Sequence, residues 1–208
     1  MPAFRRDAGS PLESVSFRNA SMCLGRKGPY LRACELPLPD MTSKDLDLID
    51  NGTLNQIKKT LVDRKETLAV AESVTAGIFQ TALASATDAS QYFHGGITVY
   101  NLGQKARHLQ VNPIHAESCN SVSNRVAEEM AVNVCKLFSS DWGIGVTGYA
   151  TMDPVIKMNQ PFAWYAIANN QHIREHGCLE HPADEPARIQ YYYVNEILKR
   201  LNNILGNR

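Results

Sequence analysis

Apolar residues follow two different spacings along the chain, and the changes of spacing divide it into helices and strands. Leu54, Ile57 and Leu61 recur at helical spacing, whereas residues 67–72 (TLAVAE) form a short, almost continuous apolar run. Residues 76–86 (AGIFQTALASA) return to a helical pattern. We therefore predict a helix, a buried strand and a second helix in this order.

The alternation of predicted strands and helices continues downstream. Residues 95–100 (GGITVY) and 141–148 (DWGIGVTG) are typical of strands. Between them, Ser123 is a good N-cap for a helix. The apolar residues of this helix share one face: Val126, Met130, Val134 and Leu137.

The last patterned segments predict a hairpin and a long helix. The segments PFAWYAIA and HIREHGCLEH flank Asn169-Asn170, a dipeptide typical of a tight turn between antiparallel strands. Asp184 and Pro186 then indicate the start of a helix. Its inner face carries four apolar residues: Val194, Ile197, Leu201 and Leu205.

Helices between buried strands predict an α/β fold, because parallel strands need crossover connections. With the hairpin added, we expect a single three-layer domain with a mixed, mostly parallel sheet flanked by helices. The 208 residues, 44% of them hydrophobic, suit one domain. Residues 1–40 contain five prolines and no apolar periodicity. We expect them to form a disordered N-terminal extension to a domain at residues 41–208.

The charge balance narrows the choice of partners. The 21 basic and 21 acidic residues cancel, which argues against binding to nucleic acid or to an anionic membrane. No apolar run is long enough to cross a bilayer, and no signal-peptide core follows the first basic residues, so we expect a cytoplasmic protein. The five cysteines are scattered and never spaced as C-x-x-C, which argues against disulfides and zinc.

A serine lies where the first predicted strand meets the next helix. In the segment LAVAESVTAG, Ser73 follows the strand, and the free amides at a helix N-terminus favour a developing oxyanion. Ser73 can therefore be a nucleophile beside its own oxyanion site. The alternative is that Ser73 or Thr75 only caps the helix.

A serine nucleophile needs a base, and Lys105 is the candidate. No G-x-S-x-G motif or histidine triad signature is present. A lysine shielded from water has a lowered pKa and can accept the serine proton as a neutral amine. Lys105 comes just after the strand at residues 95–100, where Tyr100 could orient either group. The alternative is that Lys105 is a solvated surface residue.

Four motifs occur in one order: AES-x-T-x-G, GGI-x-x-Y-x-x-x-x-K, VS at a helix start, and GIGVTG. Together they resemble the C-terminal domain of the CinA (competence/damage-inducible) family, which includes nicotinamide mononucleotide deamidases. The resemblance covers roughly residues 50–205. It implies hydrolysis of the nicotinamide mononucleotide carboxamide to nicotinate mononucleotide and ammonia, without a metal or other cofactor. It also implies a small-molecule nucleotide as substrate and a homo-oligomeric assembly.

The resemblance also assigns roles to individual residues. Ser73 and Lys105 would form a Ser/Lys hydrolytic pair, with Tyr100 in the tyrosine position of the motif. The residues implied to contact substrate are Thr75, Gly77, Gly96, Thr147, Gly148 and Arg188.

The chain departs from the family pattern where phosphate would bind. The family follows its VTG motif with a glycine-rich loop, but here Tyr149, Thr151, Met152 and Asp153 place side chains in that segment. Arg188 is the one arginine near the last helix start, and Gln190 stands where a second arginine is expected. Bidentate phosphate contacts are therefore lost.

These departures leave two hypotheses open. The first is an amidohydrolase of a divergent subgroup, and the second is a catalytically inactive member that binds a nucleotide or a protein partner. The letters HIREH match a zinc motif, but that motif needs a helix, and we predict a strand there. Residues 191–193 (YYY) lie in a predicted helix, where packing is expected in place of base stacking.

Overall fold

The computed structural model describes residues 48–152 and 158–207. The predicted disordered extension at residues 1–40 lies outside the described residues, as does Asp153. In chain order the elements are α1 (Asn51–Arg64), β1 (Leu68–Glu72), α2 (Ile78–Ser85), the short 3₁₀ helix η2 (Ala89–Gln91), β2 (Phe93–Thr98), α3 (Leu102–Leu109), α4 (Pro113–Ser118), α5 (Asn124–Phe138), β3 (Trp142–Gly148), β4 (Phe162–Asn169), β5 (His172–Glu180) and α6 (Pro186–Gly206).

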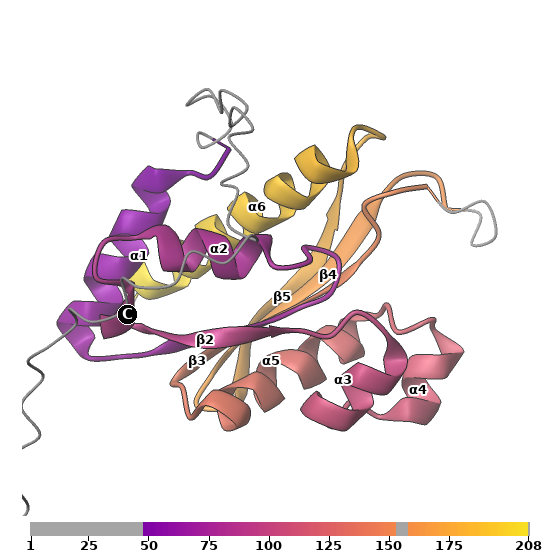
Figure 1. Cartoon of the computed structure of the whole chain (residues 1–208), viewed down its shortest axis with the longest axis horizontal. Coiled ribbons are helices and arrows are strands. Elements are labelled where there is room, and N and C mark those ends of the chain that lie inside the picture. The colour runs from indigo at the N-terminus through magenta and orange to yellow at the C-terminus, as the bar shows by residue number, and fades with distance from the viewer. Residues whose placement is uncertain (1–47, 153–157, 208) are drawn as a thin grey trace, which may run out of the picture. The chain divides into compact units, whose positions relative to one another are not determined.

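A five-stranded sheet in the order β2-β1-β3-β4-β5 separates two layers of helices. Strand β1 pairs in parallel with β2 and β3, whereas the β3–β4 and β4–β5 pairs are antiparallel. Helices α1, α2 and α6 lie on one side of the sheet, and α3, α4 and α5 lie on the other (Figure 1). The predicted three-layer α/β domain with a mixed sheet is confirmed. The sheet is not mostly parallel as predicted, because it has two parallel and two antiparallel pairings. Among the described helices, none has the length and apolar character that a membrane span requires.

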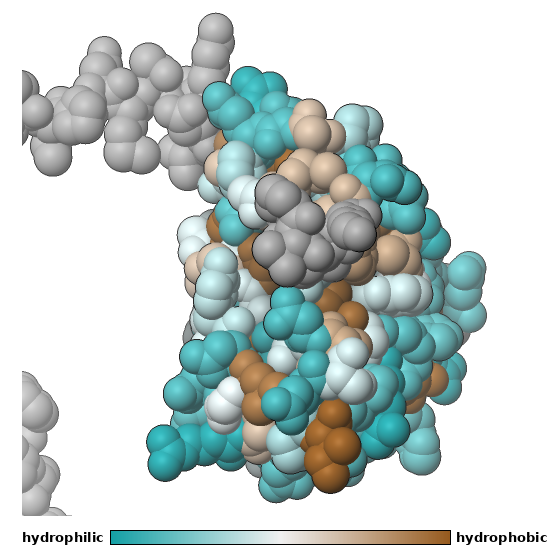
Figure 2. All heavy atoms as spheres, turned by 90° about the vertical axis from the view of Figure 1, so that its right-hand side faces the viewer, coloured by the Kyte–Doolittle hydropathy of each residue, from teal (hydrophilic) through white to brown (hydrophobic). Residues whose placement is uncertain are grey.

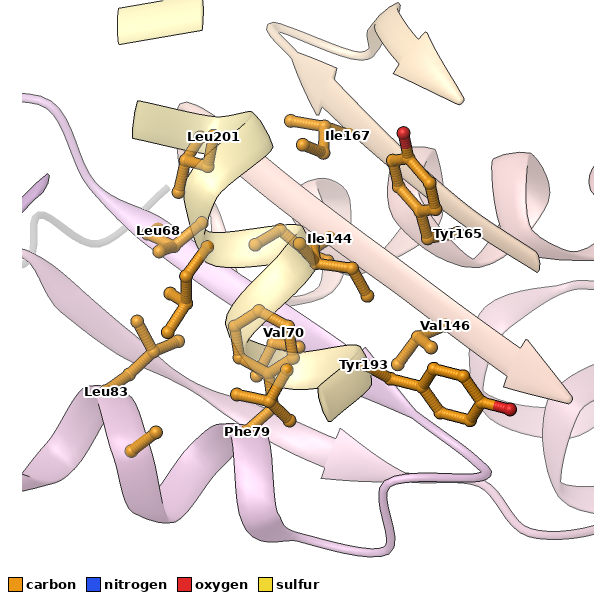
Figure 3. Close-up of a cluster of buried hydrophobic side chains, with 14 of the residues drawn as sticks. Leu68, Val70, Phe79, Leu83, Ile144, Val146, Tyr165, Ile167, Tyr193 and Leu201 are labelled. Carbon is orange, nitrogen blue, oxygen red and sulfur yellow. The ribbon is translucent and has the colours of Figure 1, made fainter. Parts of the chain in front are cut away.

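The larger core fills the space between the sheet and α1, α2 and α6. Alternate residues of the central strands, such as Val70 and Ile144, point into it and meet Tyr193 and Leu201 of α6 (Figure 3). The predicted inner face of α6 is confirmed, because its four apolar residues are fully buried: Val194, Ile197, Leu201 and Leu205. This packing fixes α6, whose first turn reaches the edge of the sheet where the candidate site lies.

Helix α5 packs closely against β3 because that strand carries glycines on this face. A Cβ atom placed on Gly145 would lie 2.3 Å from the Ala127 carbonyl oxygen, and one on Gly143 would lie 2.3 Å from the Ala131 carbonyl oxygen. The predicted cap is confirmed, since Ser123 Oγ accepts a hydrogen bond from the Val126 amide.

The apolar face of α5 ends one turn earlier than its spacing predicts. Val126, Met130 and Val134 are buried as expected, but Leu137 is 50% exposed. In the last turn, Phe138 takes the inward position and packs against Gly95 of β2. The prediction for Leu137 is therefore wrong, because the neighbouring aromatic ring fills the available space.

Strands β4 and β5 form the predicted hairpin, but the turn lies one residue later. Asn170 and Gln171 are the loop residues, with φ values of 48° and 66°, and Asn169 pairs with His172 inside the ladder. Two positive φ values are typical of a type I′ turn, which matches the twist of a hairpin. The HIREH segment lies in β5, so it is a strand as predicted.

Replacing Gly145 with alanine tests the close packing of α5 on β3. The added methyl group would collide with backbone, so we expect a loss of about 1–3 kcal/mol in the free energy of unfolding. Urea denaturation measures this loss. Gly206→Ala is the matched control, because nothing lies within 4 Å of the added Cβ. Equal stability of the two variants would contradict the packing argument.

Candidate active site

The three parallel strands end together at one edge of the sheet, beside a cavity of about 620 Å³. Ser73 follows β1, Tyr100 comes shortly after β2, and Gly148 ends β3. Ligands in open α/β sheets bind at the carboxyl ends of the strands, so this cavity is in the expected place. The described residues that line it are Ser73, Val74, Tyr100, Asn101, Leu102, Lys105, Glu117, Asn120, Ser121, Val122, Gly148, Tyr149, Ala150, Thr151, Pro186 and Gln190.

Ser73 and Lys105 touch at the wall of this cavity. The Lys105 Nζ atom lies 2.8 Å from Ser73 Oγ and donates a hydrogen bond to it. Only 6% of Ser73 and 2% of Lys105 are exposed to solvent. The interpretation of Lys105 as a solvated surface residue is therefore wrong.

Helix α3 carries Lys105 to this position, and the sequence pattern did not predict that helix. It begins directly after β2, where Asn101 Oδ1 accepts a hydrogen bond from the Gln104 amide. Lys105 and Leu109, four residues apart, are the buried residues of α3. The signals available in the sequence were the asparagine cap and the apolar partner Leu109.

Burial lowers the pKa of Lys105 from its ordinary value of 10.5 to about 8, because the ammonium form loses its hydration. Within the described part of the chain, no carboxylate forms an ion pair with Lys105 to reverse this effect. A substantial fraction of the amine is therefore neutral slightly above neutral pH. A neutral amine in contact with a hydroxyl can accept its proton.

Glu72, which the sequence analysis passed over, organises the turn that holds Ser73. Its fully buried carboxylate accepts hydrogen bonds from the backbone amides of Gly77, Phe79 and Gln80, and from the Thr75 hydroxyl at 2.6 Å. It thus occupies the first turn of α2 as a capping group would. A lone acidic residue ending an apolar strand before a helix was the available signal.

This arrangement corrects two expectations about the turn. Ser73 and Thr75 do not cap α2, since the N-cap is Gly77, with φ of 105°, and makes no side-chain cap bond. The amides at the start of α2 do not form an oxyanion site either, because Glu72 and the Thr75 carbonyl already accept their hydrogen bonds. The Ser73 hydroxyl is left for its contact with Lys105.

The residues implied to contact substrate divide into two groups. Gly148 lines the cavity, whereas Thr75, Gly77, Gly96, Thr147 and Arg188 are not among the described residues that line it. Thr147 donates from Oγ1 to the Ser121 carbonyl at 2.8 Å. A Cβ on Gly96 would lie 2.6 Å from Gln80 Cγ, so this glycine accommodates α2.

The start of α6 presents an amide to the cavity in place of a guanidinium group. Arg188 is exposed and lies 3.7 Å from Glu185 in an ion pair. Gln190 lines the cavity and donates from Nε2 to the Val74 carbonyl at 2.7 Å. Gln190 therefore supports the turn that carries Ser73.

Tyr100 lines the cavity without touching the Ser/Lys pair. It is 73% exposed, and no hydrogen bond joins it to Ser73 or Lys105 within the described residues. Its predicted orienting role therefore has no contact in support, and its ring is available to a ligand.

The comparisons with known proteins agree with this architecture. The model of the CinA C-terminal domain matches residues 51–205. The chain belongs to the CinA C-terminal domain family. A CinA-like protein from Picosynechococcus is 45% identical over 87 residues, which cover 42% of this chain and 21% of the relative. Another from Trichodesmium erythraeum is 36% identical over 137 residues, which cover 65% and 32%. The chain thus spans about a fifth to a third of these curated relatives.

Solved structures of CinA superfamily proteins show the same fold. One from Klebsiella pneumoniae gives a TM-score of 0.71 at 22% identity and covers 76% of this chain and 98% of the other. A competence/damage-inducible protein from Agrobacterium tumefaciens gives 0.64 at 19% identity and covers 76% and 98%.

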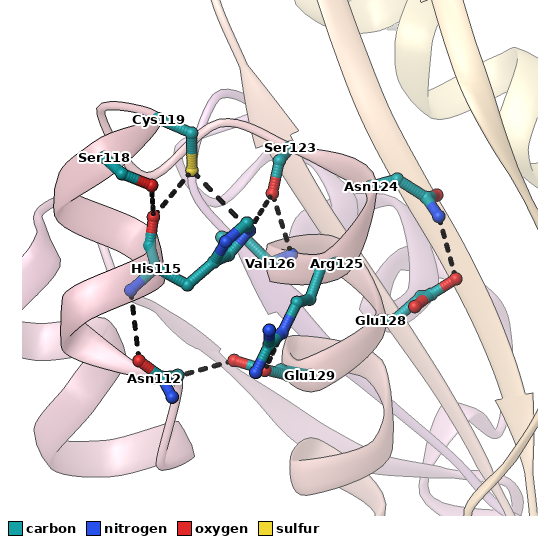
Figure 4. Close-up of polar contacts among 10 residues, drawn as sticks. All are labelled: Asn112, His115, Ser118, Cys119, Ser123, Asn124, Arg125, Val126, Glu128 and Glu129. Atoms are coloured by element: carbon teal, nitrogen blue, oxygen red, sulfur yellow. Dashed lines mark hydrogen bonds and ion pairs between the residues drawn. The ribbon is translucent and has the colours of Figure 1, made fainter.

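One wall of the cavity in this CinA domain is the connection from α4 to α5, which a polar network holds in place (Figure 4). His115 Nε2 lies 2.9 Å from Ser123 Oγ, which caps α5. Glu129 accepts from the Asn112 amide at 2.8 Å, and the Asn112 side chain caps α4. The short α4 is therefore fixed to α5, which positions Glu117 and Asn120 at the cavity.

Replacing Glu72 with glutamine tests its role under Ser73. The amide oxygen is a weaker acceptor and the NH₂ group would face other donors, so we expect a loss of about 2–3 kcal/mol in the free energy of unfolding. Thermal and urea unfolding measure it. Glu180→Gln, at an exposed site on β5, is the control and should change stability little. A neutral Glu72→Gln would contradict the capping role.

Replacing Lys105 with methionine tests the cost of burying the amine. The unfolded chain holds the lysine proton up to pH 10.5 and the folded chain up to about pH 8, so wild-type stability rises with pH through this window. Methionine should therefore stabilise the domain at pH 7 by up to about 3 kcal/mol. The advantage should shrink between pH 8 and 10.5 in urea titrations. A difference that does not change with pH would contradict the lowered pKa.

Proposed function

We propose that this CinA domain is an amidohydrolase that uses Ser73 as nucleophile and Lys105 as base. The observation that carries this proposal is the buried 2.8 Å contact between Lys105 Nζ and Ser73 Oγ at a cavity wall. Nicotinamide mononucleotide is the default substrate, because the family resemblance implies it. Hydrolysis of its carboxamide would give nicotinate mononucleotide and ammonia.

The proposed reaction proceeds through an acyl-enzyme. Ser73 Oγ attacks the carboxamide carbon while Lys105 Nζ accepts the hydroxyl proton. The tetrahedral intermediate collapses as Lys105 returns that proton to the leaving amine, which departs as ammonia. A water molecule then attacks the ester, Lys105 accepts its proton, and the return of this proton to Ser73 Oγ releases the carboxylic acid.

The oxyanion in this mechanism needs a donor other than the start of α2. Val74 lines the cavity next to Ser73, and within the described residues its backbone amide donates to no protein acceptor. We assign this amide to the oxyanion, since a donor beside the nucleophile stabilises the negative charge as it develops. Gln190 holds the turn by donating to the Val74 carbonyl.

Ammonia release from nicotinamide mononucleotide tests the proposal, with Ser73→Ala as the variant. The alanine removes the nucleophile and a small group only, so we expect activity to fall by at least about 10³-fold, with a nearly unchanged thermal melt. Ser85→Ala, at an exposed site in α2 outside the cavity, is the control and should keep wild-type activity. Full activity in Ser73→Ala would contradict the nucleophile assignment.

The pH profile tests the base. Only neutral Lys105 can accept the Ser73 proton, so kcat/KM should rise about tenfold per pH unit below the lysine pKa of about 8 and level off above it. Lys105→Met should abolish activity at every pH, whereas Lys59→Met on the exposed face of α1 should have no effect. A profile that is flat from pH 6 to 9 would contradict a lysine base.

The alternative is a non-catalytic member that binds a nucleotide or a protein partner. One observation favours this alternative: among the described residues that line the cavity, no arginine is present to hold the phosphate of the expected substrate. Binding measured by calorimetry together with no ammonia release from any carboxamide would support this alternative.

A further inference from the structure

We infer that the cavity prefers a flat carboxamide of neutral or positive charge without a phosphate over the corresponding mononucleotide. This inference rests on the proposed hydrolysis and names its substrate class. The probe with this chemistry is nicotinamide riboside, which keeps the cationic pyridinium ring and the carboxamide of nicotinamide mononucleotide and lacks the phosphate.

The first argument is the charge of the cavity. Among the described residues that line it, Lys105 and Glu117 are the only ones whose side chains can carry a full charge near neutral pH. Lys105 is buried against Ser73, and with its pKa lowered to about 8 it still carries most of its positive charge at pH 7. The two opposite charges therefore nearly cancel, and the described wall supplies no net positive charge to hold a phosphate dianion.

The second argument is that Glu117 has no partner of its own. This side chain is exposed on α4, and within the described residues it forms no side-chain hydrogen bond or ion pair. The polar network around His115 fixes the backbone of α4, so the Glu117 side chain extends from a rigid helix that lines the cavity. An unpaired carboxylate at this position attracts a positively charged ring.

The third argument is the exposed ring of Tyr100, which follows β2 and also lines the cavity. An aromatic ring that is 73% exposed offers a face for stacking on a flat cation. On the face of the molecule that Figure 2 shows, hydrophilic residues make up most of the coloured surface, with apolar residues at separate places. Tyr100 therefore supplies an exposed stacking platform at the cavity.

The fourth argument is that the groups expected to bind phosphate are engaged elsewhere. Arg188 pairs with Glu185 outside the cavity lining, and Gln190 donates to the Val74 carbonyl. The amides that begin α2 are bound to Glu72. The helix N-terminus that would favour an anion therefore already has its anion.

The experiment compares ammonia release from nicotinamide riboside and nicotinamide mononucleotide by the full chain. Wild type should prefer the riboside by about tenfold in kcat/KM, since one unfavourable charge contact at the exposed Glu117 has about this size. Glu117→Lys should reverse the preference. Asp63→Lys, an equal change of charge on α1 outside the cavity, should leave it unchanged.

Tyr100 is tested through the separation of KM from kcat. Tyr100→Phe keeps the stacking face and should resemble wild type, whereas Tyr100→Leu should raise the KM for the riboside about tenfold with kcat nearly unchanged. A fall of kcat in Tyr100→Phe would instead assign the hydroxyl to the reaction and overturn the platform role.

The outcomes separate this inference from the proposed function. Preference for the mononucleotide in wild type would overturn the inference and leave the hydrolysis standing. Absence of ammonia from both compounds would overturn the hydrolysis. In that case calorimetry on wild type and Glu117→Lys decides the ligand class: tighter binding of the riboside that the variant loses supports the inference, and equal or no binding of the two compounds overturns it.

Discussion

The site depends on one interaction, the contact of a buried amine with a buried hydroxyl. Lys105 is 2% exposed, and an ammonium ion in such a place loses hydration that its hydrogen bond to Ser73 only partly replaces. Because no carboxylate among the described residues pairs with it, burial lowers the pKa of the Lys105 amine to about 8. The same burial that costs stability produces the neutral amine that the proposed mechanism needs as its base, so stability and the proposed chemistry are linked in one side chain.

Glu72 makes this arrangement possible from the other side of the turn. In many helices the serine after a strand satisfies the first amides, and its oxygen is then engaged. Here the carboxylate of the preceding residue satisfies three amides and the Thr75 hydroxyl. Glu72 therefore caps the N-terminus of α2, and the Ser73 hydroxyl remains free to contact Lys105. The cost is that α2 cannot also bind an anionic ligand at its N-terminus.

The sequence predicts the fold where buried residues recur periodically, but it predicts the candidate site only in part. The strands around Val70 and Ile144 and the inner face of α6 were predictable, because apolar spacing reports burial directly. Helix α3 was not predicted, since its buried residues are Lys105 and Leu109, and a lysine reads as polar wherever it lies. Thr75 and Gly96 fit the motif, and the contacts that the structure shows for them support the turn and the packing of α2.

A motif shared within a family can thus reflect two different demands, chemistry and the geometry that presents it. Ser73 and Lys105 meet at the cavity, whereas Gly96 and Thr147 hold neighbouring backbone in place. The geometry of the site depends on contacts within the protein, so the residues that make these contacts are needed whatever the ligand is. Residues whose only role would be to contact a phosphate are needed only when the ligand carries one. Gln190, which lines the cavity near the start of α6, follows this logic, because it donates to the Val74 carbonyl. It stabilises the turn that carries Ser73 through a contact within the protein, whatever the ligand.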